Sequence, residues 1–177
     1  MRIISGKNRG RILKPPKNLN ARPTTDFARE GLFNILENSL HLEELTILDL
    51  FAGTGSIGLE FGSRGSKSIT MIDNNRLHIK FIQRLINELN YDSAEAMLED
   101  VFVYLRNSTD QFDLVFADPP YNMAGLEEIP DLIFEYDLLR NDGWFIFEHS
   151  VNHDFSKHSH FFKHRKYGSV NFSFFKA

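Results

Sequence analysis

The middle of the chain alternates short apolar runs with longer amphipathic stretches. The runs ILDL at 47–50 and DLVFA at 113–117 are almost continuously apolar, which is typical of parallel strands buried on both faces. The stretches between such runs repeat apolar residues at the helical period. We expect strands at 46–50, 68–73, 94–98, 112–117 and 144–148, and helices at 56–63, 75–89, 101–106 and 126–136. This alternation predicts an α/β fold with an open, doubly wound sheet.

The two ends of the chain have other patterns. Two aromatic-rich runs at 161–167 and 170–176 flank Gly168 and Ser169, a pair suited to a type II′ turn, so an antiparallel hairpin is expected to close the sheet. Residues 2–4 and 11–14 are predicted to form a small hairpin around Asn8-Arg9-Gly10. A helix should follow with Thr25 as its N-cap. Its expected apolar stripe is Phe27, Gly31, Leu32, Ile35 and Leu36. We therefore divide the chain into a basic extension, 1–40, and a main domain, 41–177.

Composition narrows the class of protein. The 177 residues are 42% hydrophobic and 25% charged, as in a globular domain. No apolar run approaches the roughly 20 residues that span a bilayer, and no apolar segment follows the basic N-terminus as in a secretory signal. The absence of cysteine excludes a disulfide scaffold, a zinc-thiolate site and a thiol nucleophile. We expect a cytoplasmic protein with neither a membrane nor a metal partner; the histidines near the C-terminus lack the clustered acids of a metal site.

Charge is distributed unevenly along the chain. Residues 1–29 carry a formal charge of +7, residues 30–150 carry −15, and residues 151–177 carry +4. A basic arm on an acidic body predicts a polyanionic partner such as a nucleic acid. A solvated N-terminal extension would explain the same charges equally well.

A glycine-rich loop follows the first expected strand. Gly53, Gly55 and Gly58 fit G-x-G-x-x-G, a pattern that lets an adenosine cofactor approach the backbone and that also serves NAD and FAD. Asp49 beside the loop would repel a pyrophosphate, but it suits the ammonium group of S-adenosylmethionine. The alternative is a glycine turn that only packs a helix on a strand.

Acidic residues end the next two expected strands. The Asp73 carboxylate can accept hydrogen bonds from both hydroxyls of a ribose. Asp100 could accept a hydrogen bond from an adenine amine, with Glu99 as the competing candidate. Capping of the following helix explains Asp100 nearly as well, and the two roles are compatible.

The motif Asp118-Pro119-Pro120-Tyr121 directly follows an apolar strand. Its two prolines stiffen the chain at the carboxyl end of the strand, where open α/β sheets bind ligands. The Asp118 carboxylate and the Pro119 carbonyl are acceptors that can hold both N–H bonds of an exocyclic amine, and Tyr121 offers a flat face to an extruded base. An ordinary proline-rich strand exit is the alternative.

Together, these motifs resemble those of class I S-adenosylmethionine-dependent amino-methyltransferases. The opening residues are similar to those of the RsmD family over three segments: Arg2-Ile3-Ile4-x-Gly6-Lys7-x-Arg9-Gly10-Arg11, Arg22-Pro23-Thr24-Thr25-Asp26 and Arg29-Glu30-Gly31-Leu32-Phe33-Asn34. The resemblance implies a Rossmann-like, seven-stranded sheet and methylation of the N2 amine of a guanine in 16S ribosomal RNA of the small subunit, within a small-subunit particle. The family usually has a helix after Glu148, but here the segment before Phe161 is short, so we expect a turn.

These expectations assign roles to residues. Catalysis is expected from Asp118, Pro119, Pro120 and Tyr121. S-adenosylmethionine is expected to bind Asp49, Phe51, Gly53, Thr54, Gly55, Asp73, Asn74 and Asp100. Ribosomal RNA is expected to contact Lys7, Arg9, Arg11, Lys14 and Arg22.

Three other functions use part of this pattern. A DNA adenine-N6 methyltransferase shares Asp-Pro-Pro-Tyr, although 177 residues leave little room for a target-recognition region. A nucleotide-dependent dehydrogenase shares the glycine loop, but has no use for Asp118 to Tyr121. A non-enzymatic RNA-binding assembly factor could keep a vestigial pocket.

Overall fold

A seven-stranded sheet forms the centre of the protein. The computed structural model describes residues 1–16, 19 and 25–177. The strand order is β3-β2-β1-β4-β5-β7-β6; neighbours from β3 to β5 pair in parallel, and β7 is antiparallel to both β5 and β6. The strands are β1 (Thr46–Asp49), β2 (Ser68–Asp73), β3 (Ala94–Leu98), β4 (Phe112–Ala117), β5 (Leu139–His149), β6 (Phe161–Tyr167) and β7 (Val170–Lys176). The expected sheet with its C-terminal antiparallel hairpin is confirmed.

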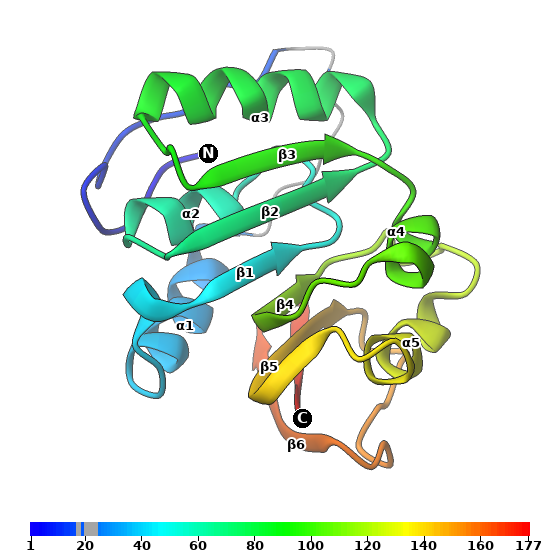
Figure 1. Cartoon of the computed structure of the whole chain (residues 1–177). Coiled ribbons are helices and arrows are strands. Elements are labelled where there is room, and N and C mark those ends of the chain that lie inside the picture. Colours follow the sequence, from blue (N-terminus) through cyan, green and yellow to red (C-terminus); the bar gives the residue numbers. More distant parts are fainter. Residues whose placement is uncertain (17–18, 20–24) are drawn as a thin grey trace.

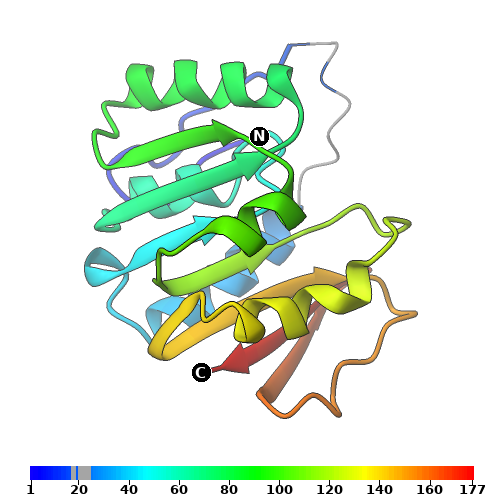
Figure 2. The same ribbon diagram turned by 45° about the vertical axis from the view of Figure 1, so that its right-hand side comes forward.

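Helices cover both faces of the sheet (Figures 1 and 2). One apolar cluster joins one face to α1 (Asp26–Glu37), α2 (Gly58–Ser63) and α3 (Arg76–Leu89). A second cluster joins the other face to α4 (Val101–Asn107) and α5 (Ile129–Glu135), which follows the 3₁₀ turn η2 (Leu126–Glu128). Another 3₁₀ turn, η1 (Leu42–Glu44), precedes β1. The strands read as continuous apolar runs because both of their faces are buried.

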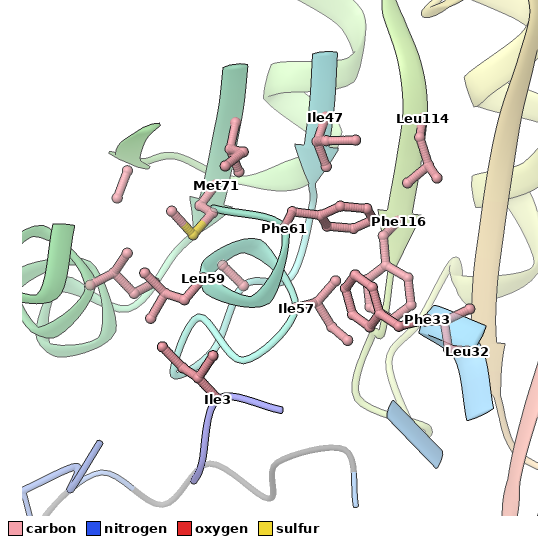
Figure 3. Close-up of a cluster of buried hydrophobic side chains, with 14 of the residues drawn as sticks. Ile3, Leu32, Phe33, Ile47, Ile57, Leu59, Phe61, Met71, Leu114 and Phe116 are labelled. Atoms are coloured by element: carbon pink, nitrogen blue, oxygen red, sulfur yellow. The ribbon is translucent and has the colours of Figure 1, made fainter. Parts of the chain in front are cut away.

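The first cluster includes residues from both parts of the predicted division (Figure 3). Ile3 of the N-terminal segment packs in the same cluster as Phe33 of α1 and Phe61 of α2. The rings of Phe33 and Phe61 meet edge to face, with 4.7 Å between centroids. The division at residue 40 stays a prediction, although one apolar core spans it.

Some local predictions need correction. Strand β5 begins at Leu139 and not at 144, and its pairing with β4 shifts register between Phe112 and Leu114. Polar residues at 140–142 hide this part of the strand from a search for apolar runs, and Asp142 has a φ of 65° within the irregularity.

The face that α1 turns to the core is only partly the expected one: Leu32 and Leu36 are buried as expected and Ile35 is partly buried against the core, but the stripe is rotated away from Phe27. Phe27 is 67% exposed, while Ala28, Arg29 and Phe33 are buried. Arg29 is accommodated because its guanidinium donates to the Arg2 carbonyl and forms a 2.9 Å ion pair with Asp26. The expected N-cap is confirmed, because the Thr25 hydroxyl accepts from the Ala28 N–H at 3.2 Å.

Both expected hairpins exist, but they differ in regularity. At the N-terminus a single antiparallel bridge joins Arg2 and Ile12, so the segment is a loose hairpin without a named strand. At the C-terminus Tyr167 pairs with Val170, and Gly168 has the positive φ, 62°, that the first central residue of a type II′ turn requires. Residues 150–160 contain turns and no helix, as expected.

None of the helices in the described ranges is long and apolar enough to cross a membrane.

Candidate active site at the carboxyl ends of the strands

A cavity of about 660 Å³ lies at the carboxyl ends of β1, β2, β4 and β5. Its volume is in the range typical of small-molecule sites. The strand order reverses between β1 and β4, and open α/β sheets bind ligands at that crevice. The predicted residues that line it are Asp49, Phe51, Gly53, Thr54, Asp73, Asn74, Asp100, Asp118, Pro119, Pro120 and Tyr121.

The glycine loop combines an open backbone with close packing. Gly53 and Gly55 have φ values of 54° and 77°, which side chains rarely adopt. Gly55 does not line the cavity; its N–H donates to the Ala52 carbonyl at 2.6 Å. A Cβ on Gly58 would lie 2.4 Å from the Met71 sulfur, so this glycine allows α2 to pack on β2.

Asp49 is a buried carboxylate at the cavity, only 1% exposed. Its Oδ2 accepts from the Gly58 N–H at 3.1 Å, while its Oδ1 has no hydrogen-bond partner among the described residues. Burial raises the pKa of Asp49 to about 7, and the negative charge of Asp73 acts in the same direction. A buried acceptor of this kind is stabilised by a cationic donor, which fits the ammonium group of S-adenosylmethionine.

Asp73 is held by the chain around it. Its Oδ2 accepts from the Gly53 N–H at 2.8 Å, its Oδ1 accepts from the Asn75 N–H at 2.8 Å, and Oδ1 also lies 3.1 Å from His78 Nδ1. A carboxylate offers about four lone-pair sites, so a site remains for a ligand hydroxyl. The side chain is therefore fixed in place before any ligand binds.

Asp100 is confirmed as the N-cap of α4. Its Oδ1 accepts from the Val103 N–H at 3.1 Å. Asp100 lines the cavity and Glu99 does not. A cap uses one lone pair only, so capping and a contact with a ligand amine are compatible.

The Asp118 to Tyr121 segment borders the same cavity from β4. Pro119 is buried, whereas Tyr121 is 42% exposed and presents its ring at the rim. The Tyr121 hydroxyl donates to Glu148 Oε1 at 3.4 Å. The stiff turn and the exposed Tyr121 ring are suited to stacking against a flat substrate.

Residues that we did not predict complete this side of the cavity. Glu148 at the end of β5 is 3% exposed and lines the cavity, as do Ser169 and Val170 at the turn between β6 and β7. The signal for Glu148 was present in the sequence, since it is an acid that follows an apolar strand, as Asp49 and Asp73 do. His78, one turn into α3, was also missed.

The basic N-terminal hairpin lies along α2. The buried Glu60 carboxylate accepts from the Ile4 and Ser5 N–H groups at 2.8 and 3.0 Å, and the Lys7 N–H donates to the Ser63 carbonyl at 2.8 Å. At the cavity end, the Thr54 hydroxyl lies 3.7 Å from the Met1 sulfur. The hairpin is thus fixed to the helix that follows the glycine loop.

The predicted RNA-binding side chains differ in their surroundings. Arg9, Arg11 and Lys14 are exposed. The Lys7 ammonium is also exposed, but it lies 3.4 Å from the Asn90 carbonyl and 4.6 Å from the centre of the Tyr91 ring. Arg22 lies outside the described residues.

This sheet order, with a glycine-rich loop after β1 and Asp-Pro-Pro-Tyr after β4, defines the fold of a class I methyltransferase. A family model described as "Conserved hypothetical protein 95" matches residues 1–176. The chain belongs to this family. Its relatives include proteins named "Ribosomal RNA small subunit methyltransferase D", so the RsmD family expected from the motifs is confirmed.

Two relatives and one solved structure illustrate the similarity. "Ribosomal RNA small subunit methyltransferase D" of Escherichia coli K12 is 34% identical over 144 residues, 81% of this chain and 69% of that protein. "Putative rRNA methyltransferase YlbH" of Bacillus subtilis is 33% identical over 153 residues, 84% of this chain and 82% of that protein. The structure of "Putative methyltransferase yhhF from Escherichia coli" superposes with a TM-score of 0.88 and 30% identity, covering 99% of this chain and 97% of that one.

Proposed function

We propose that this chain transfers a methyl group from S-adenosylmethionine to the exocyclic N2 amine of a guanine in 16S rRNA of the small subunit. One observation carries the proposal: a single cavity is lined both by the acids after β1 and β2 and by the Asp-Pro-Pro-Tyr turn after β4. The curated relatives named as small-subunit rRNA methyltransferases support the choice of substrate.

The residues after β1, β2 and β3 are proposed to bind the cofactor. Asp49 faces the ammonium group, Asp73 accepts from the ribose, and Asp100 accepts from the adenine amine. Phe51, Gly53, Thr54 and Asn74 line the same part of the cavity and complete this site. Gly55, which does not line the cavity, is proposed to shape the loop. When bound, S-adenosylmethionine supplies an electrophilic methyl group on a sulfonium, whose transfer leaves a neutral thioether.

The residues after β4 are proposed to hold the amine. The lone pair of a guanine N2 is conjugated into the ring, which makes it a poor nucleophile. Asp118 and the Pro119 carbonyl accept its two N–H bonds and turn the lone pair toward the methyl group, while Pro120 stiffens the turn. Because the amine is already oriented when it binds, the activation barrier is lower, and the two acceptors stabilise the positive charge that grows on nitrogen. The nitrogen then gives up one proton to solvent.

Ribosomal RNA, within a small-subunit particle, is the proposed partner. Arg9, Arg11, Lys14 and Lys7 are proposed to contact phosphates, which position the substrate without reading its sequence. Tyr121 provides the ring on which the extruded base stacks, a contact typically worth about 1–3 kcal/mol. Arg22 is proposed for the same phosphate contacts from its position in the motif.

The test is methyl transfer from labelled S-adenosylmethionine to three acceptors: small-subunit particles from cells that lack this chain, naked 16S rRNA, and DNA. Nuclease digestion then identifies the labelled nucleoside and its position. We expect N2-methylguanosine from particles or rRNA. Label in N6-methyladenine of DNA would overturn the proposal, and binding of rRNA without any label would favour an assembly factor.

A further inference from the structure

Glu148 is a buried acid on the substrate side of the cavity. It is 3% exposed, yet it lines the cavity beside Tyr121, whose hydroxyl is 3.4 Å from its Oε1. The parallel pairing of Ala117 with Phe147 puts the next residues, Asp118 and Glu148, side by side at the carboxyl ends of β4 and β5. Glu148 is therefore a buried acidic acceptor next to the residue that is proposed to hold the amine.

The Asp-Pro-Pro-Tyr turn cannot by itself choose a base. Asp118 and the Pro119 carbonyl are both acceptors, and they would hold the amine of adenine, cytosine or guanine equally well. The bases differ in the ring nitrogens that flank the amine: guanine has two, N1 and N3, and only N1 carries a hydrogen, while adenine and cytosine have one. Guanine carries a donor there, N1–H, whereas adenine N1 and cytosine N3 carry a lone pair.

We propose that the Glu148 carboxylate accepts the N1–H of the target guanine and thereby selects guanine over the other bases that carry an exocyclic amine. This inference rests on the function proposed above. Glu148 adjoins the residue that holds the amine, as N1 adjoins the amine on the base. A carboxylate has about four lone-pair sites, so it can accept from more than one donor, and a base N–H can be one of them. Opposite adenine or cytosine, the carboxylate would face a lone pair, and a buried polar site rejects such a ligand strongly.

The test compares guanine with 2-aminopurine, which keeps the same 2-amine but has a lone pair at N1. Small-subunit particles are reconstituted with either base at the nucleotide that the methyl-transfer experiment identifies. The wild-type chain should prefer guanine in kcat/KM by about 10- to 100-fold, as expected for one charge-assisted hydrogen bond. Glu148→Gln should methylate guanine more slowly and narrow the preference to within about threefold, because the amide can donate an N–H to N1 of 2-aminopurine. The change in ratio between variant and wild type is the readout, so the missing O6 of 2-aminopurine cancels.

Two variants serve as controls. Glu135→Gln makes the same chemical change at an exposed position on α5 that does not line the cavity, and it should leave the ratio unchanged. Tyr121→Phe removes the hydroxyl that contacts Glu148. If Glu148 only positions Tyr121, this variant should shift the ratio as Glu148→Gln does; we expect it to keep the wild-type ratio within about threefold. Thermal unfolding and calorimetry with S-adenosylmethionine should show each variant folded and able to bind the cofactor.

The outcomes separate the two proposals. If the wild-type chain does not methylate guanine in either particles or rRNA, the proposed function fails. If it methylates guanine and Glu148→Gln keeps both the rate and the ratio, only the inference about Glu148 is wrong. If Tyr121→Phe shifts the guanine preference as much as Glu148→Gln does, Glu148 acts by positioning the Tyr121 ring.

Discussion

The two sides of the cavity are built differently. On the β1–β3 wall (Asp49, Gly53, Asp73 and Asp100), the carboxylates accept backbone N–H groups: Gly58 for Asp49, Gly53 for Asp73 and Val103 for Asp100. On the β4–β5 wall (Asp118, Tyr121, Glu148 and Ser169), the Tyr121–Glu148 contact joins two side chains from separate elements, 27 residues apart. The first wall is thus held by hydrogen bonds from the backbone to carboxylates, whereas the second includes a hydrogen bond between two side chains.

This difference predicts whether a substitution should change cofactor binding or methyl transfer. Substitutions in the β1–β3 wall remove an acceptor from both the loop and the proposed cofactor, so cofactor affinity and local stability should fall together. Substitutions in the β4–β5 wall should change turnover and base choice while the cofactor still binds.

The largest expected effect is on turnover. Asp118→Ala should lower single-turnover methyl transfer by about 100- to 1000-fold, the usual scale for loss of one preorganised polar group. Calorimetry should show S-adenosylmethionine affinity within a few-fold of the wild type. A loss of cofactor affinity as large as the loss of rate would contradict the separation of the walls.

Asp73→Ala should act on the other wall. Loss of charge-assisted hydrogen bonds, about 1.5–3 kcal/mol, should weaken S-adenosylmethionine binding by about 10- to 100-fold. The Gly53 and Asn75 N–H groups also lose their acceptor, so the apo protein should unfold at a lower temperature. Asp73→Asn, which keeps one oxygen, is the matched control and should lose less. Unchanged affinity in a folded Asp73→Ala variant would show that this carboxylate does not contact the cofactor.

The raised pKa of Asp49 predicts two opposite dependences on pH. The pKa is about 7 when folded and 3.8 in its unperturbed form, so the folded state holds the proton more tightly. The free energy of unfolding of the apo protein should therefore fall as pH rises from about 4 to above 7. Binding of a cationic ammonium favours the ionised carboxylate, so S-adenosylmethionine affinity should instead increase, by about fivefold between pH 6 and pH 7, below the range in which an α-ammonium group loses its own proton.

Asp49→Asn is the test of both dependences. It should flatten the stability profile and the affinity profile over the same pH range, as measured by chemical denaturation and calorimetry. An affinity profile of the wild type that is flat from pH 6 to pH 7 would mean that Asp49 does not meet a cation.

The smallest expected effect concerns the basic hairpin. Arg9→Ala, Arg11→Ala and Lys14→Ala should each reduce the magnitude of the slope of log affinity for RNA against log salt by about 0.7–0.9, or roughly fivefold in affinity near 0.15 M salt. Lys67→Ala, an exposed lysine just before β2, is the matched control. Cofactor affinity should not change, although the hairpin is fixed to α2. If all four variants keep the wild-type slope of log affinity against log salt, the hairpin is only a solvated extension.

Local motifs were readable from the sequence because they lie at strand ends. The glycine loop, Asp73, Asp100 and Asp118 each follow an apolar run, and parallel strands bring their carboxyl ends to one edge. The chain order of the elements was equally clear from periodicity. Each of these motifs can be recognised within one short segment, before it is known which strands pair.

What the sequence did not reveal depends on longer contacts. Ser169 and Val170 reach the cavity only because β7 enters the sheet between β5 and β6. Buried charges were hidden as well: Glu60 in α2 reads as a surface acid, yet it is 1% exposed because it binds the N-terminal backbone. The start of β5 was missed because its polar residues interrupt the apolar run.

The position of β7 also bears on how the protein is made. Strands β1, β2 and β3 and the helices between them follow one another from 46 to 98. The β4–β5 wall, in contrast, includes the turn before β7, the strand that is synthesised last. At ordinary rates of translation the gap between Leu98 and Lys176 takes roughly 4–16 s. The residues of the β1–β3 wall are therefore synthesised before Ser169 and Val170, which complete the other wall of the cavity.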